Sequence, residues 1–501
     1  MKKIIAMILI IVLTSLVLAA CDGEKTPIGG DDINVPRDDT TIPPDDIGAE
    51  ILEAPTITHG IPDTMDFGGH EFRILNTIQS DRHYVNMMME PIYEELTGEI
   101  INDAAYQRSS EIQERFNAQI TEIRVPTGSR EAQFRRAAMA GDNAFDIASL
   151  TFGEAFRAAQ EGLIYDINNL IYVDLNAPWW DQNARQSLSI QNRVFFLPGA
   201  YEVANFDMTR IILFNRQLVE DYQIQYCLYT LVLEGQWTMD RFFAMASMVS
   251  EDLNGDGVFD HNDKFGVGTT ADHVAFGAFM MGSGERMVRK DHEDVPYFAA
   301  GNERFVNVFQ YLVENFYGGD FFFNPRNAPG AEAWLNNMFM ESRLLFFNIT
   351  FNRIPLFRGM DADFGILPIP KFDELQENYY NESGGGKVAV IPVSVADPQR
   401  SGAFLELYAY WGWREVVPAY KELSLQTRFA RSAESALMVD IIDESRVYDL
   451  GRLFWGADAW DPFVSLFGSR RPDVTSTLDR HSDRVNRAIE LTMERFEDTF
   501  N

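Results

Sequence analysis

Residues 119–162 read QITEIRV PTGS REAQFRRAAMA GDNA FDIASL TFGEAFRAAQ EG, and this stretch decides the fold. Gln119–Val125 predicts a strand and Phe145–Leu150 predicts a buried strand. Arg130–Ala140 predicts a helix that a glycine ends, and a second helix runs through Gln160 to another glycine. The strand–helix–strand–helix order predicts a largely parallel α/β sheet with right-handed crossovers.

Strand and helix signals alternate on both sides of this stretch. The further predicted elements are strands over His70–Ile78, Leu344–Asn348, Phe364–Pro368 and Val388–Val393, and helices over Asp103–Asn117 and Ser482–Asp498. Ala105, Ile112 and Phe116 fall on one face of the first of these helices. No repeat of 20–50 residues is present, which disfavours a solenoid or a propeller. The chain is therefore expected to be of the α/β class.

The composition is that of a globular protein. Hydrophobic residues make up 46% of the 501 and charged residues 23%, which excludes collagen-like, low-complexity and wholly disordered chains. At roughly 150 residues per domain, the length predicts two to four domains or lobes. The net charge of −33, from 75 acidic and 42 basic residues, repels phosphate backbones, so no nucleic-acid partner is expected.

The first 20 residues predict a signal peptide. Lys2 and Lys3 precede the apolar run Ile4–Leu18, which is shorter than the roughly 18–20 residues that cross a bilayer. The run ends in Leu18-Ala19-Ala20-Cys21, which resembles the bacterial lipobox and implies lipidation of Cys21. The alternative is an ordinary secretory signal followed by a chance cysteine. We expect a protein anchored by lipid to the cell membrane, on its extracytoplasmic face.

Residues 21–60 predict a flexible tether. Ten acidic residues face only Lys25 and Arg37 there, prolines recur, and aromatic residues are absent. Such a segment cannot bury enough apolar surface to offset the entropy of ordering it. Most of the negative charge therefore belongs to the folded body, which begins near residue 61.

The sequence DLNGDGVFDHND at 252–263 has the spacing of a calcium-binding loop. Oxygen ligands fall at positions one, three, five, seven, nine and twelve of the loop, and they belong to Asp252, Asn254, Asp256, Val258 (its carbonyl), Asp260 and Asp263. The aspartate at position twelve, where glutamate is usual, is expected to lower the affinity. A structural Ca²⁺ would tie residues 239–250 to a strand at 264–268. The alternative is a turn that such residues form without metal.

Catalytic signatures are absent from the sequence. There is no H-E-x-x-H pair, no G-x-S-x-G elbow and no phosphate-binding loop, and Gly384-Gly385-Gly386-Lys387 lacks the spacing of the last of these. Paired carboxylates for glycoside hydrolysis stay open, because their separation is invisible in a sequence. The chain is expected not to be an enzyme.

Aromatic residues make up 13% of the chain. Trp179 and Trp180 are adjacent, so they cannot face the same way in regular structure, and Trp237 follows Gly235-Gln236. Flat rings beside carboxylates and amides suit sugar recognition. The alternative for each tryptophan is packing within a lobe.

Several short motifs occur in an order that resembles a known family. They are Phe145–Ile147 with Glu161–Ile167, Pro178–Trp180, Ile212–Arg216, Gly235–Thr238, the loop at 252–263, Asp363–Lys371 and Val390–Pro392. Over almost all of 61–501 the chain resembles the solute-binding lipoproteins of bacterial ABC importers, which have the type 2 periplasmic-binding fold. Each motif alone is weak, and their order is specific.

The resemblance implies two α/β lobes with a hinge and an interlobe cleft. Lobe 1 would be 61–208 plus 390–425, and lobe 2 would be 209–389 plus 426–501. Strands near Phe206–Asn215 and Val388–Val395 would cross between the lobes. The cleft residues implied by position are Thr151, Glu154, Asp207, Arg210, Asn348 and Phe351, with Trp180, Tyr201 and Trp237 as stacking platforms.

The function implied is that of a monomeric, lipid-anchored receptor. It would capture a solute, with the aromatic residues favouring a sugar or oligosaccharide, and deliver it to an ABC permease in the membrane. Two alternatives stay open: a surface-anchored carbohydrate-active enzyme, and an adhesin or structural lipoprotein.

Overall fold

The computed structural model describes residues 57–77, 95–202, 204–326, 328–425 and 433–500. The unit Gly60–Asn501 carries all the elements below. The predicted signal peptide, the lipidation at Cys21 and nearly all of the tether lie outside the described residues. Among the described helices, none combines the length and the apolar character needed to span a bilayer.

Lobe 1 is built on a four-stranded sheet in the order β13-β3-β1-β2. Strands β1 (His70–Thr77), β2 (Ala118–Val125) and β3 (Ile147–Thr151) are parallel, and β13 (Lys387–Val390) is antiparallel to β3. The largely parallel sheet predicted for this part of the chain is confirmed.

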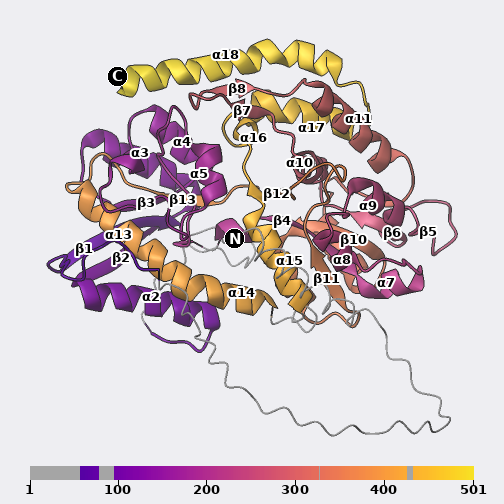
Figure 1. The fold of residues 1–501 in the computed structure, drawn as a ribbon, viewed down its shortest axis with the longest axis horizontal. Helices are drawn as coiled ribbons and strands as arrows, with labels where there is room; N and C mark the ends of the chain where they lie inside the picture. Colours follow the sequence, from indigo (N-terminus) through magenta and orange to yellow (C-terminus); the bar gives the residue numbers. More distant parts are fainter. Residues whose placement is uncertain (1–56, 78–94, 203, 327, 426–432, 501) are drawn as a thin grey trace, which may run out of the picture. The chain divides into compact units, whose positions relative to one another are not determined.

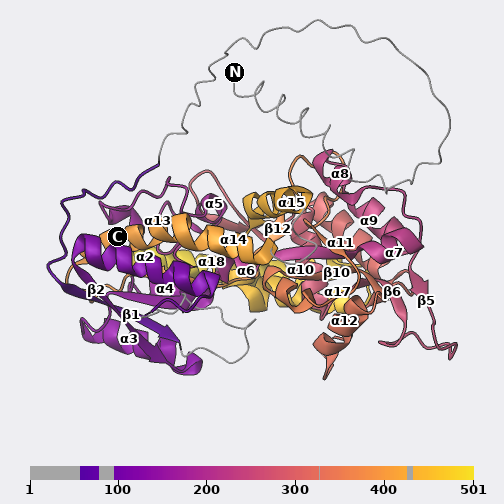
Figure 2. The same ribbon diagram turned by 90° about the horizontal axis from the view of Figure 1, so that it is seen from below.

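The helices of lobe 1 cover this sheet (Figures 1 and 2). They are α2 (Ile100–Phe116), α3 (Arg130–Ala140), α4 (Phe152–Gln160), α5 (Gln182–Leu188), α6 (Ala204–Asp207), α13 (Pro398–Trp411) and α14 (Val417–Leu425), with short helical turns at Thr127–Ser129, Ile167–Asn169 and Gly412–Val416. Helix α3 has the bounds that the sequence predicts. Ala105, Ile112 and Phe116 form the buried face of α2, as predicted, and α2 ends where Asn117 turns left-handed at φ 52°.

Lobe 2 contains a mixed sheet. Its strands β11 (Phe364–Leu367), β4 (Arg210–Asn215), β10 (Leu344–Thr350), β6 (Lys264–Gly268) and β5 (Ser250–Glu251) lie in that order, and β9 (Phe322–Phe323) also pairs with β6. Strand β4 is antiparallel to both of its neighbours, β10 and β11. Strand β4 enters this sheet from the hinge, opposite in direction to these two neighbours, whereas β6 pairs in parallel with β10 and β9.

The remaining elements of lobe 2 enclose a core rich in phenylalanine. They are α7 (Arg216–Asp221), α8 (Leu228–Leu233), α9 (Met239–Ala246), α10 (Asp272–Gly282), β7 (Val288–Lys290), β8 (Pro296–Phe298), α11 (Glu303–Tyr317), α12 (Ala331–Met340) and a helical turn at Phe351–Phe357. Residues 284–330, which carry no recognisable motif, form the β7–β8 hairpin, α11 and β9. Phe305, Phe309 and Phe316 of α11 are buried on one side of that helix because they recur at helical spacing.

Three segments join the lobes at the hinge. Thr209 and Ser383 pair in antiparallel fashion, and β12 (Asn381–Glu382) pairs in parallel with β14 (Arg446–Val447). The predicted crossing at Val388–Val395 is wrong, since Lys387–Val390 lies inside the sheet of lobe 1 and the chain crosses just before it. The sequence does not indicate the crossing at β14, because a strand of two residues is too short to show an alternation of apolar and polar residues.

The C-terminal segment contacts both lobes. It contains α15 (Ala433–Glu444), α16 (Leu450–Phe454), a helical turn at Gly456–Trp460, α17 (Asp461–Gly468) and α18 (Thr475–Phe500). Helix α18 contacts α4 in lobe 1 and β8 in lobe 2, and it runs along the top of Figure 1. Near its end, Thr499 Oγ1 donates to the carbonyl of Gln160 at 3.3 Å, and Phe496 packs on Phe156. The last predicted helix is confirmed and is longer than expected.

Helix α13 carries a carboxyl group into the core of lobe 1. Glu406 is fully buried, and Trp180 Nε1 donates to its Oε2 at 3.0 Å. Burial raises the pKa of Glu406 to about 7, although the Trp180 hydrogen bond opposes the rise.

Replacing Glu406 with glutamine is expected to raise the melting temperature at pH 8 by roughly 2–4 °C. The folded protein holds a proton that the unfolded chain releases between about pH 4.5 and 7, so the free energy of unfolding falls as the pH rises through this window. Glutamine keeps an acceptor for Trp180 and carries no charge. Calorimetry at pH 5 and pH 8 tests this, with exposed Glu111→Gln as the control. A gain of equal size at both pH values contradicts it.

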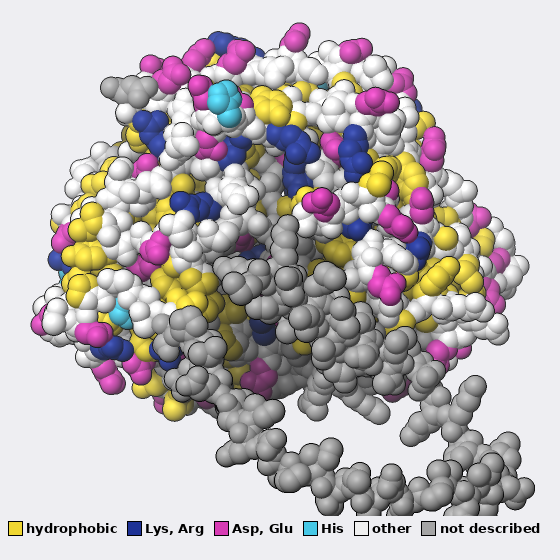
Figure 3. Space-filling model, viewed as in Figure 1, with side chains coloured by type: hydrophobic (Ala, Val, Ile, Leu, Met, Phe, Trp, Pro, Cys, Tyr) yellow, Lys and Arg dark blue, Asp and Glu magenta, His cyan; other side chains and the backbone are white. Residues whose placement is uncertain are grey.

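Surface charge on this unit is mixed. On the face drawn in Figure 3, acidic and basic side chains are interspersed and neither sign forms a continuous patch. The excess of acid is therefore spread over the visible surface, which favours solubility rather than one charged docking face.

Candidate functional site

One strand of each lobe, β3 in lobe 1 and β10 in lobe 2, has its carboxyl end at the hinge. In lobe 1, β3 ends at Thr151, and its partner there is Lys387, the first residue after the crossing. In lobe 2, β10 ends at Thr350, and its partner is Arg210, again next to a crossing. Ligands of open α/β sheets bind beyond the carboxyl ends of the strands. We call these two edges, with the crossings between them, the carboxyl edges.

Thr151 and Glu154 form a capping box at the carboxyl edge of lobe 1. Thr151 Oγ1 accepts from the backbone N–H of Glu154 at 3.3 Å, and Glu154 Oε2 accepts from the backbone N–H of Thr151 at 2.8 Å. The same carboxylate oxygen accepts from Arg130 Nη2. These hydrogen bonds hold the first turn of α4 against α3, and the predicted role of both residues in binding a ligand stays a prediction.

Lys387 is buried at the same edge. Its side chain is adjacent to Thr151 in register, and its Nζ donates to Thr77 Oγ1 at 2.9 Å at the end of β1. Burial, with the nearby guanidinium of Arg130, lowers the pKa of Lys387 to about 8. The amine therefore stays largely charged at neutral pH in a place where charge is poorly solvated.

Two arginines share one carboxylate at the hinge. Arg210 Nε lies 3.8 Å from Glu382 Oε2, and Arg452 pairs with Glu382 Oε1. Burial lowers the pKa of Arg210 to about 10 and that of Arg452 to about 9, and the guanidinium of Arg210 adds to the effect on Arg452. Arg210, predicted from position, thus belongs to a buried cluster that also contains two residues the sequence did not single out.

The three predicted stacking platforms are core residues. Trp237 is 0% exposed, and its Nε1 donates to the carbonyl of Pro368 at 2.8 Å. Tyr201 is equally buried, and its hydroxyl donates to the carbonyl of Leu197 and accepts from the N–H of Ala389. The prediction that they present a ring face to the cleft is wrong, because each ring is enclosed by its own lobe.

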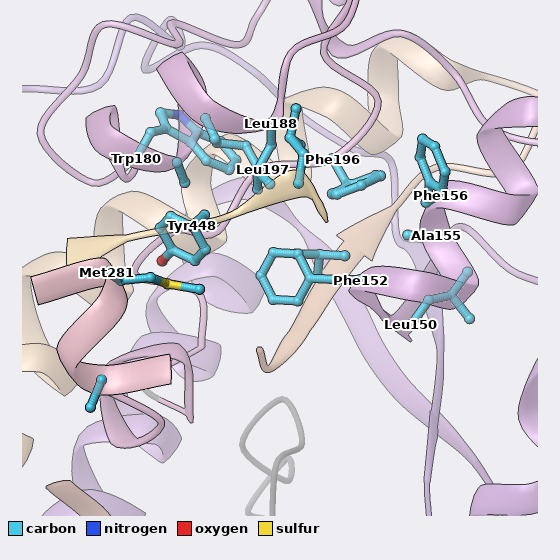
Figure 4. Packing of buried hydrophobic residues seen from close by; sticks show 14 of the residues in the cluster. Leu150, Phe152, Ala155, Phe156, Trp180, Leu188, Phe196, Leu197, Met281 and Tyr448 are labelled. Carbon is cyan, nitrogen blue, oxygen red and sulfur yellow. The ribbon is translucent and has the colours of Figure 1, made fainter. Parts of the chain in front are cut away.

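Trp180 is buried as well, but it borders a cavity. Figure 4 shows its ring near Leu188 and Leu197, and its N–H is taken by Glu406. The cavity measures about 160 Å³ and lies beside the hinge. Its lining residues are Pro178, Trp179, Trp180, Asp181, Pro198, Gly199, Ala200, Glu202, Asn205, Phe206, Trp413, Val417, Tyr420, Lys421, Asp443 and Arg446. Trp180 is therefore mainly a core residue, and it also lines this cavity.

The other three predicted cleft residues are engaged within the protein. Asp207 accepts a hydrogen bond from the hydroxyl of Tyr420. Asn348 is buried and donates to the carbonyl of Ile211 at 3.4 Å. Phe351 is buried against Phe206 and belongs to a hydrophobic cluster that also contains Tyr420 of α14. The prediction that Asn348 and Phe351 face the cleft is therefore wrong. Asp207 lies at the hinge.

Sequence reasoning missed Lys387, Arg130, Glu382 and Arg452. Only Lys387 carried a signal, since it follows three glycines, and this run was compared with phosphate loops alone. The other three stand in ordinary helical or extended sequence. Their burial arises from contacts between distant segments, which no local pattern records.

The loop at 252–263 joins β5 to β6 and is closed by its own hydrogen bonds. The carboxylate of Asp252 accepts from the N–H groups of Gly255 and Gly257, each at 2.7 Å, and Asp263 accepts from those of Leu253 and Asp260. In the described part of the chain, no three His, Cys, Asp or Glu side chains gather as a metal site requires. The calcium site predicted from the spacing of this loop stays a prediction.

The sequence matches no known family model and no curated protein. Its fold is similar to that of a cyclo/maltodextrin-binding protein in complex with maltotetraose, with a TM-score of 0.54 and 11% identity over 89% of this chain and 99% of that one. It is also similar to an extracellular solute-binding protein from Staphylococcus aureus in complex with maltose, with a TM-score of 0.55 and 11% identity over 85% of this chain and 97% of that one.

A third similar structure is UgpB from Mycobacterium tuberculosis in complex with glycerophosphocholine. Its TM-score is 0.52, with 12% identity over 85% of this chain and 99% of that one. Such identities show the fold alone. The chain has the two-lobed type 2 periplasmic-binding fold, with a hinge and an interlobe cleft.

Proposed function

We propose that this protein is a lipid-anchored receptor on the extracytoplasmic face of the cell membrane. It binds a sugar or oligosaccharide between its lobes and delivers it to an ABC import permease, without covalent chemistry. Closure of the hinge on the solute produces the form that the permease recognises.

The observation that carries this proposal is the position of the carboxyl edges. Strands β3 and β10 both end beside the segments that join the lobes. A solute bound between these two strand ends would touch both lobes and favour closure of the hinge. The similar structures named above include complexes with maltotetraose and maltose, which supports a carbohydrate. The run Leu18–Cys21 with the apolar segment before it supports the anchor.

A thermal-shift screen of mono- and oligosaccharides tests the proposal. A solute present at 100 times its Kd is expected to stabilise the protein by about 2.7 kcal/mol, because it binds the folded state and not the unfolded chain. Heat-inactivated protein in isothermal titration with the same sugar is the control. A melting temperature that moves with none of the sugars contradicts the proposal and favours an adhesin or structural lipoprotein. Release of sugar from a polysaccharide by the purified protein favours the enzyme.

We also propose a structural Ca²⁺ in the loop at 252–263, on its spacing alone. Chelation with EDTA is expected to lower the melting temperature, because the ion would bind the folded loop and not the unfolded chain. Asp252→Asn, which removes one ligand charge, is the variant in which the response to EDTA becomes smaller. A melting curve that EDTA leaves unmoved contradicts the calcium site, and then the hydrogen bonds of the loop are sufficient to hold it.

A further inference from the structure

Lys387 is a buried ammonium group that forms no ion pair with the residues the structure describes. Only 5% of the residue is exposed, and its one hydrogen bond is to the neutral hydroxyl of Thr77. Among the described residues, no carboxylate oxygen lies within 4.0 Å of its Nζ, and Glu202 and Glu154 act on it from farther away. The half-buried Lys290, by contrast, has its Nζ 2.5 Å from Asp294 Oδ1.

Arg130 adds unused donors beside it. The side chain is 0% exposed, and within the described ranges Nη2 is its one atom with a partner, the carboxylate of Glu154. Nε and Nη1 have no hydrogen-bond partner. Glu154 carries a single negative charge and is paired with Arg130, so it does not also balance Lys387.

The opposite edge repeats the imbalance. Arg210 and Arg452 share the single carboxylate of Glu382, and Arg210 Nε makes no hydrogen bond. Buried cations and donors without partners are costly, so a fold keeps them only where something offsets the cost.

We propose that the solute carries an anionic group, which Lys387 and Arg130 bind at the carboxyl edge of lobe 1. This inference rests on the proposed function and narrows it to acidic sugars. The shared chemistry is an anionic oxygen, supplied by the carboxylate of a uronic acid or by a phosphate ester. The ammonium of Lys387 and the free N–H groups of Arg130 supply the donors that such an oxygen needs.

Matched pairs of sugars test the charge of the solute. D-galacturonate and its oligomers are compared with D-galactose and its oligomers, and D-glucose 6-phosphate with D-glucose, by titration calorimetry at pH 7. An acidic member is expected to bind 10–100-fold more tightly than its neutral parent, as a hydrogen bond to a charged group implies. The galacturonate and phosphate arms separate the two sources of charge.

The two proposals fail in different ways. Equal affinity for a neutral and an acidic partner overturns the anionic solute and leaves the sugar receptor intact. Binding of neutral sugars alone also overturns the anionic solute and leaves the sugar receptor intact. Binding of no saccharide in either arm overturns both.

The variant Lys387→Met adds a readout that a structural lysine would not give. Methionine fills the space without burying a charge, so the ligand-free protein is expected to melt at a higher temperature while affinity for the acidic sugar falls 10–100-fold and affinity for its neutral parent stays the same. Lys290→Met, which breaks an ion pair away from the carboxyl edges, is the control, with a lower melting temperature and unchanged affinity. Unchanged affinity of Lys387→Met for the acidic sugar overturns the proposal.

Discussion

Glu382→Gln is expected to destabilise the protein by about 3–5 kcal/mol, the usual cost of breaking a buried ion pair from one side. Glu382 is fully buried at the hinge and is the single carboxylate that pairs with both Arg210 and Arg452. Glutamine has nearly the same shape, so packing against α10 is retained and the loss comes from charge. Two guanidinium groups are then left facing each other without a counter-charge in a poorly solvated place.

Urea unfolding followed by circular dichroism measures this loss as a lower midpoint. The matched control is Glu374→Gln, since Glu374 is exposed and also pairs with an arginine, Arg241, at 3.2 Å. An exposed pair contributes about 0–1 kcal/mol, so the control midpoint should barely move. Equal midpoints for the two variants contradict a buried charge cluster at the hinge.

Trp237→Ala is expected to cost about 3–5 kcal/mol, as for other large aromatic side chains removed from a core. The indole is enclosed, its ring packs 5.8 Å from those of Phe242 and Phe346, and its N–H is bonded to Pro368. Alanine leaves a cavity among these rings and an unpaired carbonyl. The loss should appear in the midpoint of urea unfolding.

A paired measurement separates the two roles weighed for this tryptophan. Trp237→Phe retains most of the packing, so its affinity for a solute can be measured in the folded protein. A core residue lowers stability and leaves affinity unchanged, whereas a stacking platform lowers affinity first. Trp334→Ala is the control, because Trp334 is half-buried and stacks on His261 with ring centres 4.5 Å apart, a contact of about 0.5–1.5 kcal/mol. Loss of affinity in Trp237→Phe at full stability contradicts the core role.

Local patterns predicted the elements of lobe 1 well. Helix α3 has the bounds read from its composition and its terminal glycine, and the buried face of α2 follows from spacing alone. The direction of β4 could not be predicted from the sequence, because it depends on pairing with β10 and β11, which lie more than a hundred residues away along the chain. Parallel order can be read between neighbours in sequence and not across a hinge.

The candidate site was predicted only in part. Thr151 and Glu154 stand at the carboxyl edge of lobe 1 because position after a strand is a local property, and Arg210 lies at the hinge as the first residue of β4. The aromatic residues were misassigned, since a ring beside polar sequence looks the same whether its lobe encloses it, as for Trp237, or leaves it open. The burial of Lys387 could not be predicted from the sequence, because it depends on Thr77 and Thr151, which lie far away along the chain.

Helix α18 and strand β13 have a consequence for the order in which the protein can fold. Lobe 1 lacks an outer strand until Lys387–Val390 is available, and both lobes lack the cover of α18 until Thr475–Phe500 is available. A chain emerging from the ribosome therefore exposes unfinished apolar faces and open strand edges through most of its synthesis. Such long-range pairing makes folding slow and aggregation a hazard. The protein is expected to need a holding chaperone until its last helix has been made.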